Sequence, residues 1–440
     1  MLTEFRFRLR VIGMSYRLSV IVFTLVCLLL FVGCSPNTLL DDPEDISAVE
    51  GEDRDEAHSD VVSDAHLGRW LGLYNGFGNQ GYMLAIASSD SRSADWTLDD
   101  MHSPIQRPSG TSVCSSPKAL LCGKKYFMYA TARSWDSHTY LWTSSNGVDW
   151  LLYSESPVLS YVAVGAVHYD PSNPEQPYKL WGLKKNTSGV TYYHSVDGIA
   201  WLEGAKVLEI GEPGSWDAKK ITPQAIYLEA DTWYLFYEGR DPHNFMQGGV
   251  AMAATPEGPY ERSPDNPIIR REAHANQALG RNAAEGERSL DVADASVFSP
   301  GQPVVVFDAT GRWEFNRIEA IPDPQTILVE TPLRQPYATA LRGSVRSWAW
   351  AKVYPTVVWK EGNVWKMICT CFDAYKDIYS GVCEATGLIS GSSLSDLAWD
   401  YALSPVLPMG SSLDKDWDHA SRENMSVVPN ITWNSEESLP

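Results

Sequence analysis

The chain repeats one short pattern five times, in which a strand-like segment leads into a polar turn and then an aromatic residue. The copies end at Trp96, Trp150, Trp201, Tyr260 and Trp399, so successive copies lie 54, 51, 59 and 139 residues apart. A recurring period of about 50 residues is typical of radial arrays of small sheets, in which each repeat supplies one sheet. The pattern therefore predicts an all-β chain folded as a five-bladed β-propeller, with its blades in 66–275 and 348–440.

The last interval is too long for one blade, and removing about 75 to 80 residues would restore the period. The segment 276–347 has short strand-like runs with turns of their own, such as Ser299-Pro300-Gly301. We expect it to be a small β-barrel or β-sandwich domain inserted between the fourth and fifth blades. Such a domain either binds a polymer or buttresses the rim, and the second is favoured because the segment shows no cluster of aromatic residues.

The two ends of the predicted propeller complement each other. Residues 69–74 read as a strand without a preceding partner, and 426–433 read as one strand without a sheet of its own. If the terminal strand becomes the innermost strand of the first blade, the ring closes and no sheet edge stays open. A linear stack of sheets would leave two long unpaired edges and is disfavoured.

The N-terminal segment 1–33 has the layout of a secretory signal. Four arginines precede an apolar run over 18–32 that is short for a membrane span, and Gly33 then stands directly before Cys34. This ending resembles a bacterial lipobox, which implies a diacylglycerol anchor on Cys34 and a product tethered to the cell envelope, at the outer membrane and facing the periplasm or the surface. An ordinary signal peptide with an incidental Cys34 is the alternative, and a start at Met14 would give a shorter signal.

The segment 34–65 is strongly acidic, with eleven acidic residues against Arg54. Such a run buries little and repels itself, so it predicts an extended tether, with a functional acidic tail as the alternative. The whole chain has a formal net charge of −20. This charge argues against a nucleic-acid partner and favours a neutral ligand.

The cysteines predict no metal site. Beyond Cys34 the exported chain would hold an odd set of five, and none has the paired spacing of a zinc site. One cross-strand disulfide is conceivable, between Cys383 and either Cys369 or Cys371. No cofactor is expected, while a structural calcium ion in the funnel stays open.

In a propeller, the starts of the innermost strands and the loops joining second to third strands open on one face and converge on a funnel. Carboxylates gather in the segments predicted for this face. Glycosidic bonds are cleaved by one protonated and one ionised carboxyl group, and a nearby cation helps to split their proton affinities. The candidate site residues are Asp136, Trp216, Asp217, Glu238, Arg240, His243, Asp373 and Glu423.

Four motifs, at 169–181, 195–201, 214–217 and 234–241, are similar to those of five-bladed glycoside hydrolases of the arabinanase, β-xylosidase, levansucrase and invertase group. The likeness covers roughly 66–275 and 348–440. It implies a glycosidase acting on an oligo- or polysaccharide, with Asp217 and Glu423 as catalytic carboxyl groups and Glu238 as a further acid. The other five candidates would bind substrate.

Three observations keep alternatives open. Segment 111–114, at the start of the second blade, carries no acid where the resemblance would require one. A non-catalytic carbohydrate-binding surface lipoprotein is therefore the alternative function. Asp217 could instead hydrogen-bond a turn, and Glu238 and Glu423 could each pair with a nearby arginine. Sialidase-type propellers fit less well, because their turn has one more residue between Asp and Gly and their rings usually have six blades.

Overall fold

The computed structural model describes residues 66–78, 81–93, 96–133, 136–310, 312–348, 352–372, 384–400, 407 and 421–432. All of them belong to one compact unit, Ala48–Pro440. The predicted signal 1–33, the predicted linker 34–65 and the predicted lipidation site Cys34 lie outside the described residues. Within the described part, no helix is long and apolar enough to span a membrane.

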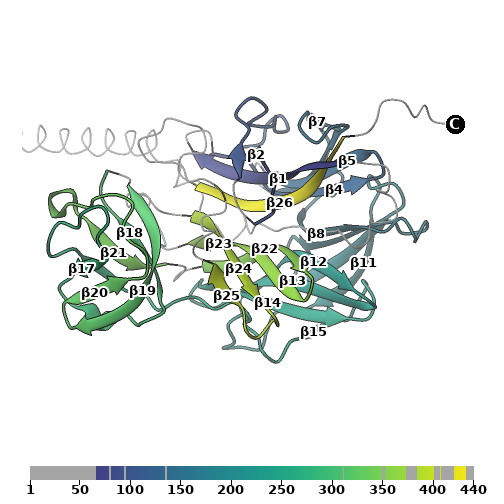
Figure 1. Ribbon diagram of the computed structural model, residues 1–440. Helices are drawn as coiled ribbons and strands as arrows, with labels where there is room; N and C mark the ends of the chain where they lie inside the picture. The colour runs from purple at the N-terminus through teal and green to yellow at the C-terminus, as the bar shows by residue number, and fades with distance from the viewer. Residues whose placement is uncertain are drawn as a thin grey trace, which may run out of the picture. The chain divides into compact units, whose positions relative to one another are not determined.

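Five antiparallel four-stranded units form the blades (Figure 1). Two of them are separate sheets, and the other three are joined into one 12-stranded sheet by single parallel pairs, Met246 with Lys352 and Glu384 with Ser421. Blade I contains β26 (Ser421–Thr432), β1 (His66–Gly78), β2 (Gly81–Ser89) and β3 (Thr97–Leu98). Blade II contains β4 (Val113–Cys122), β5 (Lys125–Arg133), β6 (Ser137–Ser144) and β7 (Leu151–Leu152). Blade III contains β8 (Val162–Tyr169), β9 (Tyr178–Lys184), β10 (Val190–Ser195) and β11 (Leu202–Leu208).

Blade IV contains β12 (Lys220–Glu229), β13 (Thr232–Arg240), β14 (Met246–Ala253) and β15 (Glu261–Arg262). Blade V contains β22 (Lys352–Glu361), β23 (Val364–Phe372), β24 (Glu384–Gly391) and β25 (Ala398–Asp400). The innermost strands β26, β4, β8, β12 and β22 contact one another in this order, and β22 contacts β26 again. This cyclic order makes the fold a closed five-bladed propeller, as the repeat predicted.

The last strand of the described chain closes the ring. In Figure 1 the yellow β26 lies against the purple β1, and the two strands pair from His66 with Thr432 to Phe77 with Ser421. β26 is thereby the innermost strand of blade I. Blade I is thus held together by hydrogen bonds between segments that lie more than 300 residues apart in sequence.

Each innermost strand carries a β-bulge at its fourth or fifth residue. The extra residues fall at 116–117 in β4, Gly165 in β8, Gln224 in β12, Thr356 in β22 and 424–425 in β26. Bulges bend a strand and leave backbone groups unpaired. The five strands are therefore irregular at one common level of the ring.

Side chains of neighbouring blades satisfy several of these backbone groups. The N–H of Ser116 donates to Asn75 Oδ1 at 3.1 Å, and the N–H of Ala119 donates to Ser426 Oγ at 3.0 Å. In the next blade the N–H of Val164 donates to Oγ1 of Thr131 at 3.1 Å. Because buried polar groups require partners, these contacts fix the blades in register around the axis.

The repeated turn joins the third strand of a blade to the fourth. In blade II the Ser144 hydroxyl accepts the N–H of Gly147 at 2.8 Å, and the indole N–H of Trp150 donates to the Gly147 carbonyl at 2.7 Å. Gly147 has a φ of 78°, and a Cβ added there would lie 2.2 Å from Leu71 of blade I. The turn of blade II thus combines hydrogen bonds of its own with a close approach to blade I, where a glycine leaves the room that is needed.

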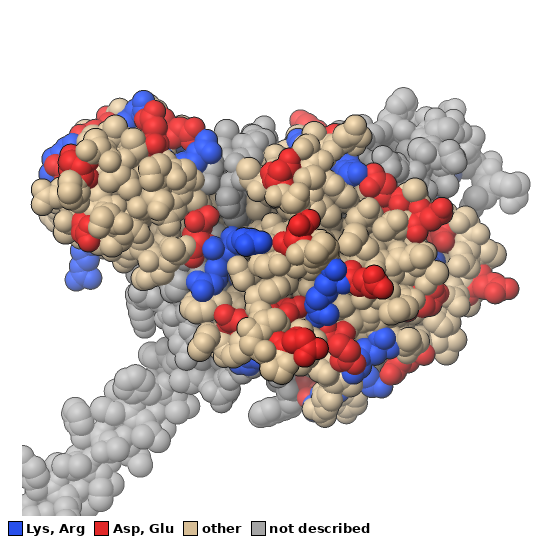
Figure 2. All heavy atoms as spheres, turned by 90° about the horizontal axis from the view of Figure 1, so that it is seen from below, with Lys and Arg blue, Asp and Glu red and all other residues tan. Residues whose placement is uncertain are grey.

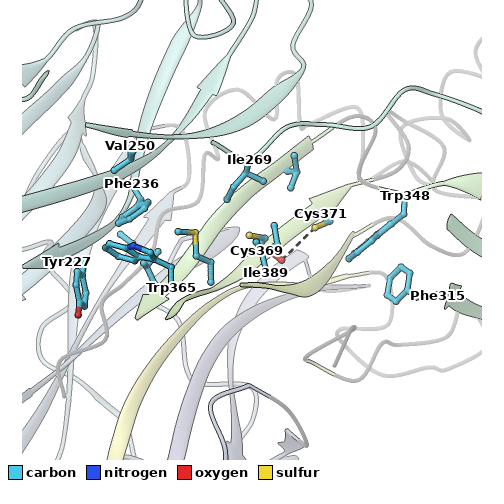
Figure 3. Packing of buried hydrophobic residues seen from close by; sticks show 14 of the residues in the cluster. Tyr227, Phe236, Val250, Ile269, Phe315, Trp348, Trp365, Cys369, Cys371 and Ile389 are labelled. Carbon is cyan, nitrogen blue, oxygen red and sulfur yellow. Dashed lines mark hydrogen bonds between the residues drawn. The ribbon is translucent and has the colours of Figure 1, made fainter. Parts of the chain in front are cut away.

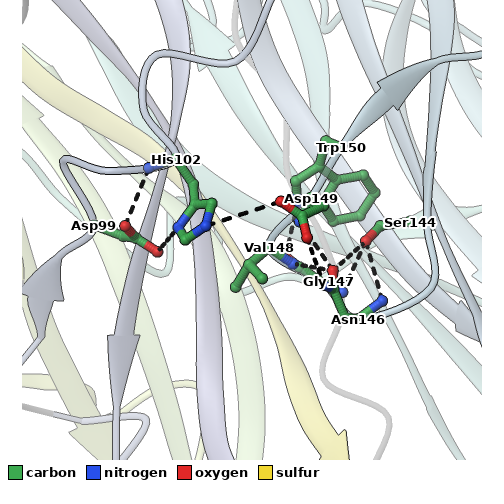
Figure 4. A network of polar contacts seen from close by, with 8 residues as sticks. All are labelled: Asp99, His102, Ser144, Asn146, Gly147, Val148, Asp149 and Trp150. Atoms are coloured by element: carbon green, nitrogen blue, oxygen red, sulfur yellow. Dashed lines mark hydrogen bonds and ion pairs between the residues drawn. The ribbon is translucent and has the colours of Figure 1, made fainter.

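The same turn receives a histidine from blade I (Figure 4). Nδ1 of His102 lies 2.7 Å from Asp99, and its Nε2 lies 3.9 Å from Asp149 of the turn. Blade III repeats the hydroxyl-to-glycine bond, with the N–H of Gly198 donating to Ser195 Oγ at 2.9 Å.

Apolar layers fill the spaces between blades. Between blades IV and V, the ring of Trp365 packs edge-on against Tyr227, Tyr234 and Phe236, with ring centroids 5.2, 5.5 and 5.8 Å apart. Figure 3 shows this layer with Cys369 and Cys371 of β23. Cys383 lies outside the described residues, so the disulfide stays a prediction.

The inserted domain has a separate core. Its strands are β16 (Asn276–Ala278), β17 (Ser289–Asp291), β18 (Pro303–Phe307), β19 (Trp313–Asp323), β20 (Thr326–Val329) and β21 (Ser344–Ser347), with short 3-10 helices η3 (Ala295–Val297) and η4 (Thr339–Leu341). They form one sheet whose two edge strands are joined by a bridge between Leu279 and Val292, as in a small barrel. Phe315 and Trp348 join the apolar layer of blades IV and V (Figure 3).

A substitution at Gly165 tests how tightly the innermost strands pack. A Cβ at this position would lie 1.9 Å from the Trp181 carbonyl oxygen and 2.3 Å from Pro223 Cγ of blade IV. We expect Gly165→Ala to lower the free energy of unfolding by about 1–3 kcal/mol, because backbone atoms must move. Urea denaturation measures this. The matched control is Gly280→Ala, where the nearest atom is 3.6 Å from the added Cβ; equal stability of the two variants would contradict the prediction.

Candidate functional site

Buried polar side chains of blades II and IV meet inside the ring. Lys118 of β4 is 0% exposed, and its ammonium donates to the carbonyl oxygen of Gln224 on β12 at 3.3 Å. β8 stands between these two strands in the ring, so the lysine side chain reaches across the axis. We refer to Lys118, Gln224, Glu238 and Arg240 as the axial cluster.

Glu238 is the carboxylate of the axial cluster. One oxygen accepts a hydrogen bond from Arg240 Nη2 at 3.2 Å, and the other accepts one from the Gln224 amide at 3.3 Å. Glu238 and Arg240 are each 1% exposed. Because both oxygens have a fixed partner, the carboxylate has one orientation in this structure.

Two polar atoms beside Glu238 lack partners among the described residues. Thr222 stands opposite Glu238 in the β12–β13 ladder, and its hydroxyl is buried without a hydrogen bond, as is Nε of Arg240. Unsatisfied buried polar groups are rare in proteins and are commonly satisfied by water or a ligand. The cluster therefore retains hydrogen-bonding capacity next to its carboxylate.

Asp217 lies on the opposite face of β13. It is 2% exposed and accepts hydrogen bonds from Arg262 Nε at 2.8 Å, the Tyr237 hydroxyl at 3.2 Å and the Ser215 hydroxyl at 2.7 Å. Tyr237 and Glu238 are consecutive strand residues, so their side chains point to opposite faces of the sheet. Asp217 and Glu238 are therefore not brought together.

The electrostatics of the Asp217 pocket are those of an ion pair. Burial alone would lower the pKa of Arg262. The hydrogen bonds and charge interactions of Arg262 with Asp217 and Tyr237 outweigh this effect, so the pKa of Arg262 lies above its usual value. Burial and the charge of Asp217 also raise the pKa of Tyr237. The tyrosine hydroxyl thus keeps its proton and can donate to the carboxylate.

Trp216 packs against blade IV next to Asp217. Its ring stacks on Tyr237 with centroids 5.6 Å apart, and a Cβ on Gly239 or Gly249 would lie 2.1 or 2.7 Å from its atoms. The two glycines make room for the indole. Its predicted role in substrate binding stays a prediction.

The other predicted site residues are dispersed. Asp136 forms an ion pair with Lys185 between blades II and III. His243 is exposed in the loop after β13, where its N–H donates to Asp241 at 2.8 Å. Asp373 and the side chain of Glu423 lie outside the described residues. The backbone of residue 423, in the innermost strand β26, pairs with Asn75 of β1.

Among the predicted residues, the structure brings together Glu238 with Arg240, and Trp216 with Asp217. It also reveals Lys118 and Gln224, which sequence reasoning missed. The available signal was a single charged residue, Lys118, inside the strand-like segment 113–122, because lysines are rarely fully buried unless paired. In the described part of the chain, no group of three or more His, Cys, Asp or Glu side chains could hold a metal ion.

Both charge signs are intermixed on the face shown in Figure 2. The predicted absence of a nucleic-acid partner stays a prediction.

The sequence matches no family model and no curated protein. Solved structures similar to the chain include a glycosyl hydrolase from Bacteroides ovatus, with 13% identity over 74% of this chain and 82% of that one, at a TM-score of 0.44. They also include the α-L-arabinanase of Cellvibrio cellulosa in complex with arabinohexaose, with 11% identity over 78% of this chain and 96% of that one, at a TM-score of 0.40. A third is the β-1,2-mannobiose phosphorylase of Listeria innocua, with 14% identity over 60% and 67% and a TM-score of 0.37.

The five-bladed architecture itself follows from the strand pairing of this chain.

The Asp217–Arg262 pair should stabilise the fold. We expect Arg262→Met to lower the free energy of unfolding by about 3 kcal/mol, because it leaves a buried carboxylate without its cation. Adding Asp217→Asn should restore part of the loss, which a double-mutant cycle in urea measures. Lys184→Met, which removes the exposed pair with Glu203, is the control and should cost less than about 1 kcal/mol. A cost no larger than that of the control would refute the pairing.

Proposed function

We propose that the chain cleaves a glycosidic bond of an extracellular glycan. The observation that carries this proposal is the axial cluster, in which the oriented carboxylate of Glu238 stands beside buried polar atoms without partners in the described part of the chain. An oriented carboxylate is one of the two groups that glycoside hydrolysis requires.

Glu423 is the second carboxyl group of the proposal. It is the third residue of β26, and Thr222, opposite Glu238, is the third residue of β12. Both innermost strands start on the same face of the propeller, so the two positions belong to one level of the ring. Arg240 and Gln224 would hold Glu238 while one carboxyl group protonates the leaving oxygen and the other attacks the sugar or activates water.

Three variants test the chemistry. Glu238→Gln and Glu423→Gln should each lower turnover per folded molecule by about 10²–10⁴-fold, because the amide cannot transfer a proton. Glu238→Gln should also lower the melting temperature, because it leaves the buried Arg240 guanidinium without its carboxylate. Substrates would be arabinohexaose, β-1,2-mannobiose and aryl glycosides, with and without phosphate to separate hydrolysis from phosphorolysis. Asp217→Asn tests the catalytic role predicted for Asp217. If this variant is less stable but keeps its turnover per folded molecule, Asp217 has a structural role and no catalytic one.

Glu319→Gln, in an exposed ion pair of the inserted domain, is the control and should keep full activity. Full activity of both Glu238→Gln and Glu423→Gln would reject the assignment.

A second candidate function is carbohydrate binding without cleavage. It is favoured by the engagement of Asp217 and Glu238 in separate ion pairs on opposite faces of β13. Retention of the protein in native gels that contain arabinan or mannan, with no products released from the same polymers, would select it.

Export and lipid anchoring at Cys34 complete the proposal. If Cys34 carries the lipid, Cys34→Ser should abolish incorporation of radiolabelled palmitate and move the protein from the membrane to the soluble envelope fraction. Unchanged labelling of the variant would exclude Cys34 as the acceptor.

A further inference from the structure

Four side chains gather between blades II and III on the face where the innermost strands start. Asp136 and His138 come from the β5–β6 connection and the start of β6, Tyr161 directly precedes β8, and Lys185 directly follows β9. We call these four residues the rim cluster. Apart from Asp136, none of them was a predicted site residue.

The backbone of Tyr161 is fixed by two members of the rim cluster. Its N–H donates to Nδ1 of His138 at 3.3 Å, and its carbonyl oxygen accepts the N–H of Lys185 at 2.8 Å. The imidazole ring lies 5.0 Å from the Tyr161 ring centroid, and the Lys185 ammonium lies 5.5 Å from it. Lys185 also pairs with Asp136 of the neighbouring blade. The tyrosine ring therefore has a defined position, although Tyr161 is 50% exposed.

Tyr161 adopts a left-handed backbone conformation, with a φ of 62°. This conformation costs a residue with a side chain about 1–2 kcal/mol, whereas glycine adopts it freely. A glycine would keep both backbone hydrogen bonds without this cost. Because strained residues often occur at functional sites, the tyrosine is a candidate for a role beyond folding.

We propose that the rim cluster is a binding subsite for one sugar ring of the glycan, with Tyr161 as its aromatic platform. A half-exposed aromatic ring offers apolar contact, and the surrounding groups offer hydrogen bonds that fix the orientation. Asp136 accepts, the Lys185 ammonium donates, and His138 can donate from Nε2 because its Nδ1 already accepts the Tyr161 N–H. These groups match the hydroxyl groups of a sugar. The charges of Asp136 and Lys185 balance, so the subsite fits a neutral sugar rather than a uronic acid.

A purely structural staple between two blades is the competing explanation. In that case the Asp136–Lys185 ion pair and the two backbone hydrogen bonds of Tyr161 would join the blades. The tyrosine ring would contribute little to either kind of contact. The two explanations predict different outcomes for Tyr161→Gly. A staple that needs the ring loses stability, whereas a binding platform loses affinity and relieves backbone strain.

The proposal rests on the proposed carbohydrate function, and the experiment separates the two. The full chain and its variants would be run in native gels containing arabinan, mannan or polygalacturonic acid, and their melting temperatures recorded. Tyr161→Ala and Tyr161→Gly should weaken retention by the neutral polymer about tenfold, and Tyr161→Phe should retain it because the ring stays. Tyr153→Ala, which removes a tyrosine 51% exposed on the outer edge of blade II, is the matched control and should bind as the unchanged protein does.

Tyr161→Gly should melt at or above the temperature of the unchanged protein. Binding unaffected by Tyr161→Ala and Tyr161→Gly would overturn the subsite while leaving the proposed function intact. Retention by polygalacturonic acid alone would overturn the neutral-sugar assignment. If the unchanged protein binds none of the polymers and cleaves no substrate, both proposals fail.

Discussion

The pairing of β26 with β1 is the constraint on which the rest of the structure depends. It joins the end of the described chain to its beginning, so that five blades share one axis. Without it, blade I would lack its innermost strand, and two sheet edges would be exposed to water. β26 also contacts β4 and β22, so blade I meets both of its neighbours through this strand.

Closure also explains why the interior is polar at one level and apolar around it. Five bulged strands converge there, and their free backbone groups need hydrogen-bond partners that apolar side chains cannot provide. Asn75, Thr131 and Ser426 satisfy such groups from neighbouring blades. The apolar layers lie farther out, where Trp365 and the rings around it separate the blades. A functional site built on the axis therefore inherits hydrogen-bonding groups from the architecture itself.

The fold could be predicted from the sequence because the repeated residues make contacts that the blades need. In blades II and III the turn has a hydroxyl that accepts a glycine N–H, a glycine with positive φ and an aromatic residue three positions after that glycine, so the pattern leaves a regular trace. The site was harder to predict. Asp217 and Glu238 both precede or end strands of blade IV, but alternation along β13 directs their contacts to opposite faces, which depends on register. Lys118 and Tyr161 matter through their burial and backbone conformation, and neither property is visible in residue spacing.

The ends of the inserted domain lie on paired strands, since Asn276 of β16 stands opposite Arg346 of β21. The chain therefore leaves blade IV and returns towards blade V through two neighbouring segments. An insertion of this kind adds about seventy residues without lengthening the distance between the end of blade IV and the start of blade V. The cost of closing a loop depends on how far apart its ends lie. Evolution can enlarge, exchange or delete such a unit while the circle of blades keeps its spacing, and the propeller can acquire new surfaces with no change to its axis.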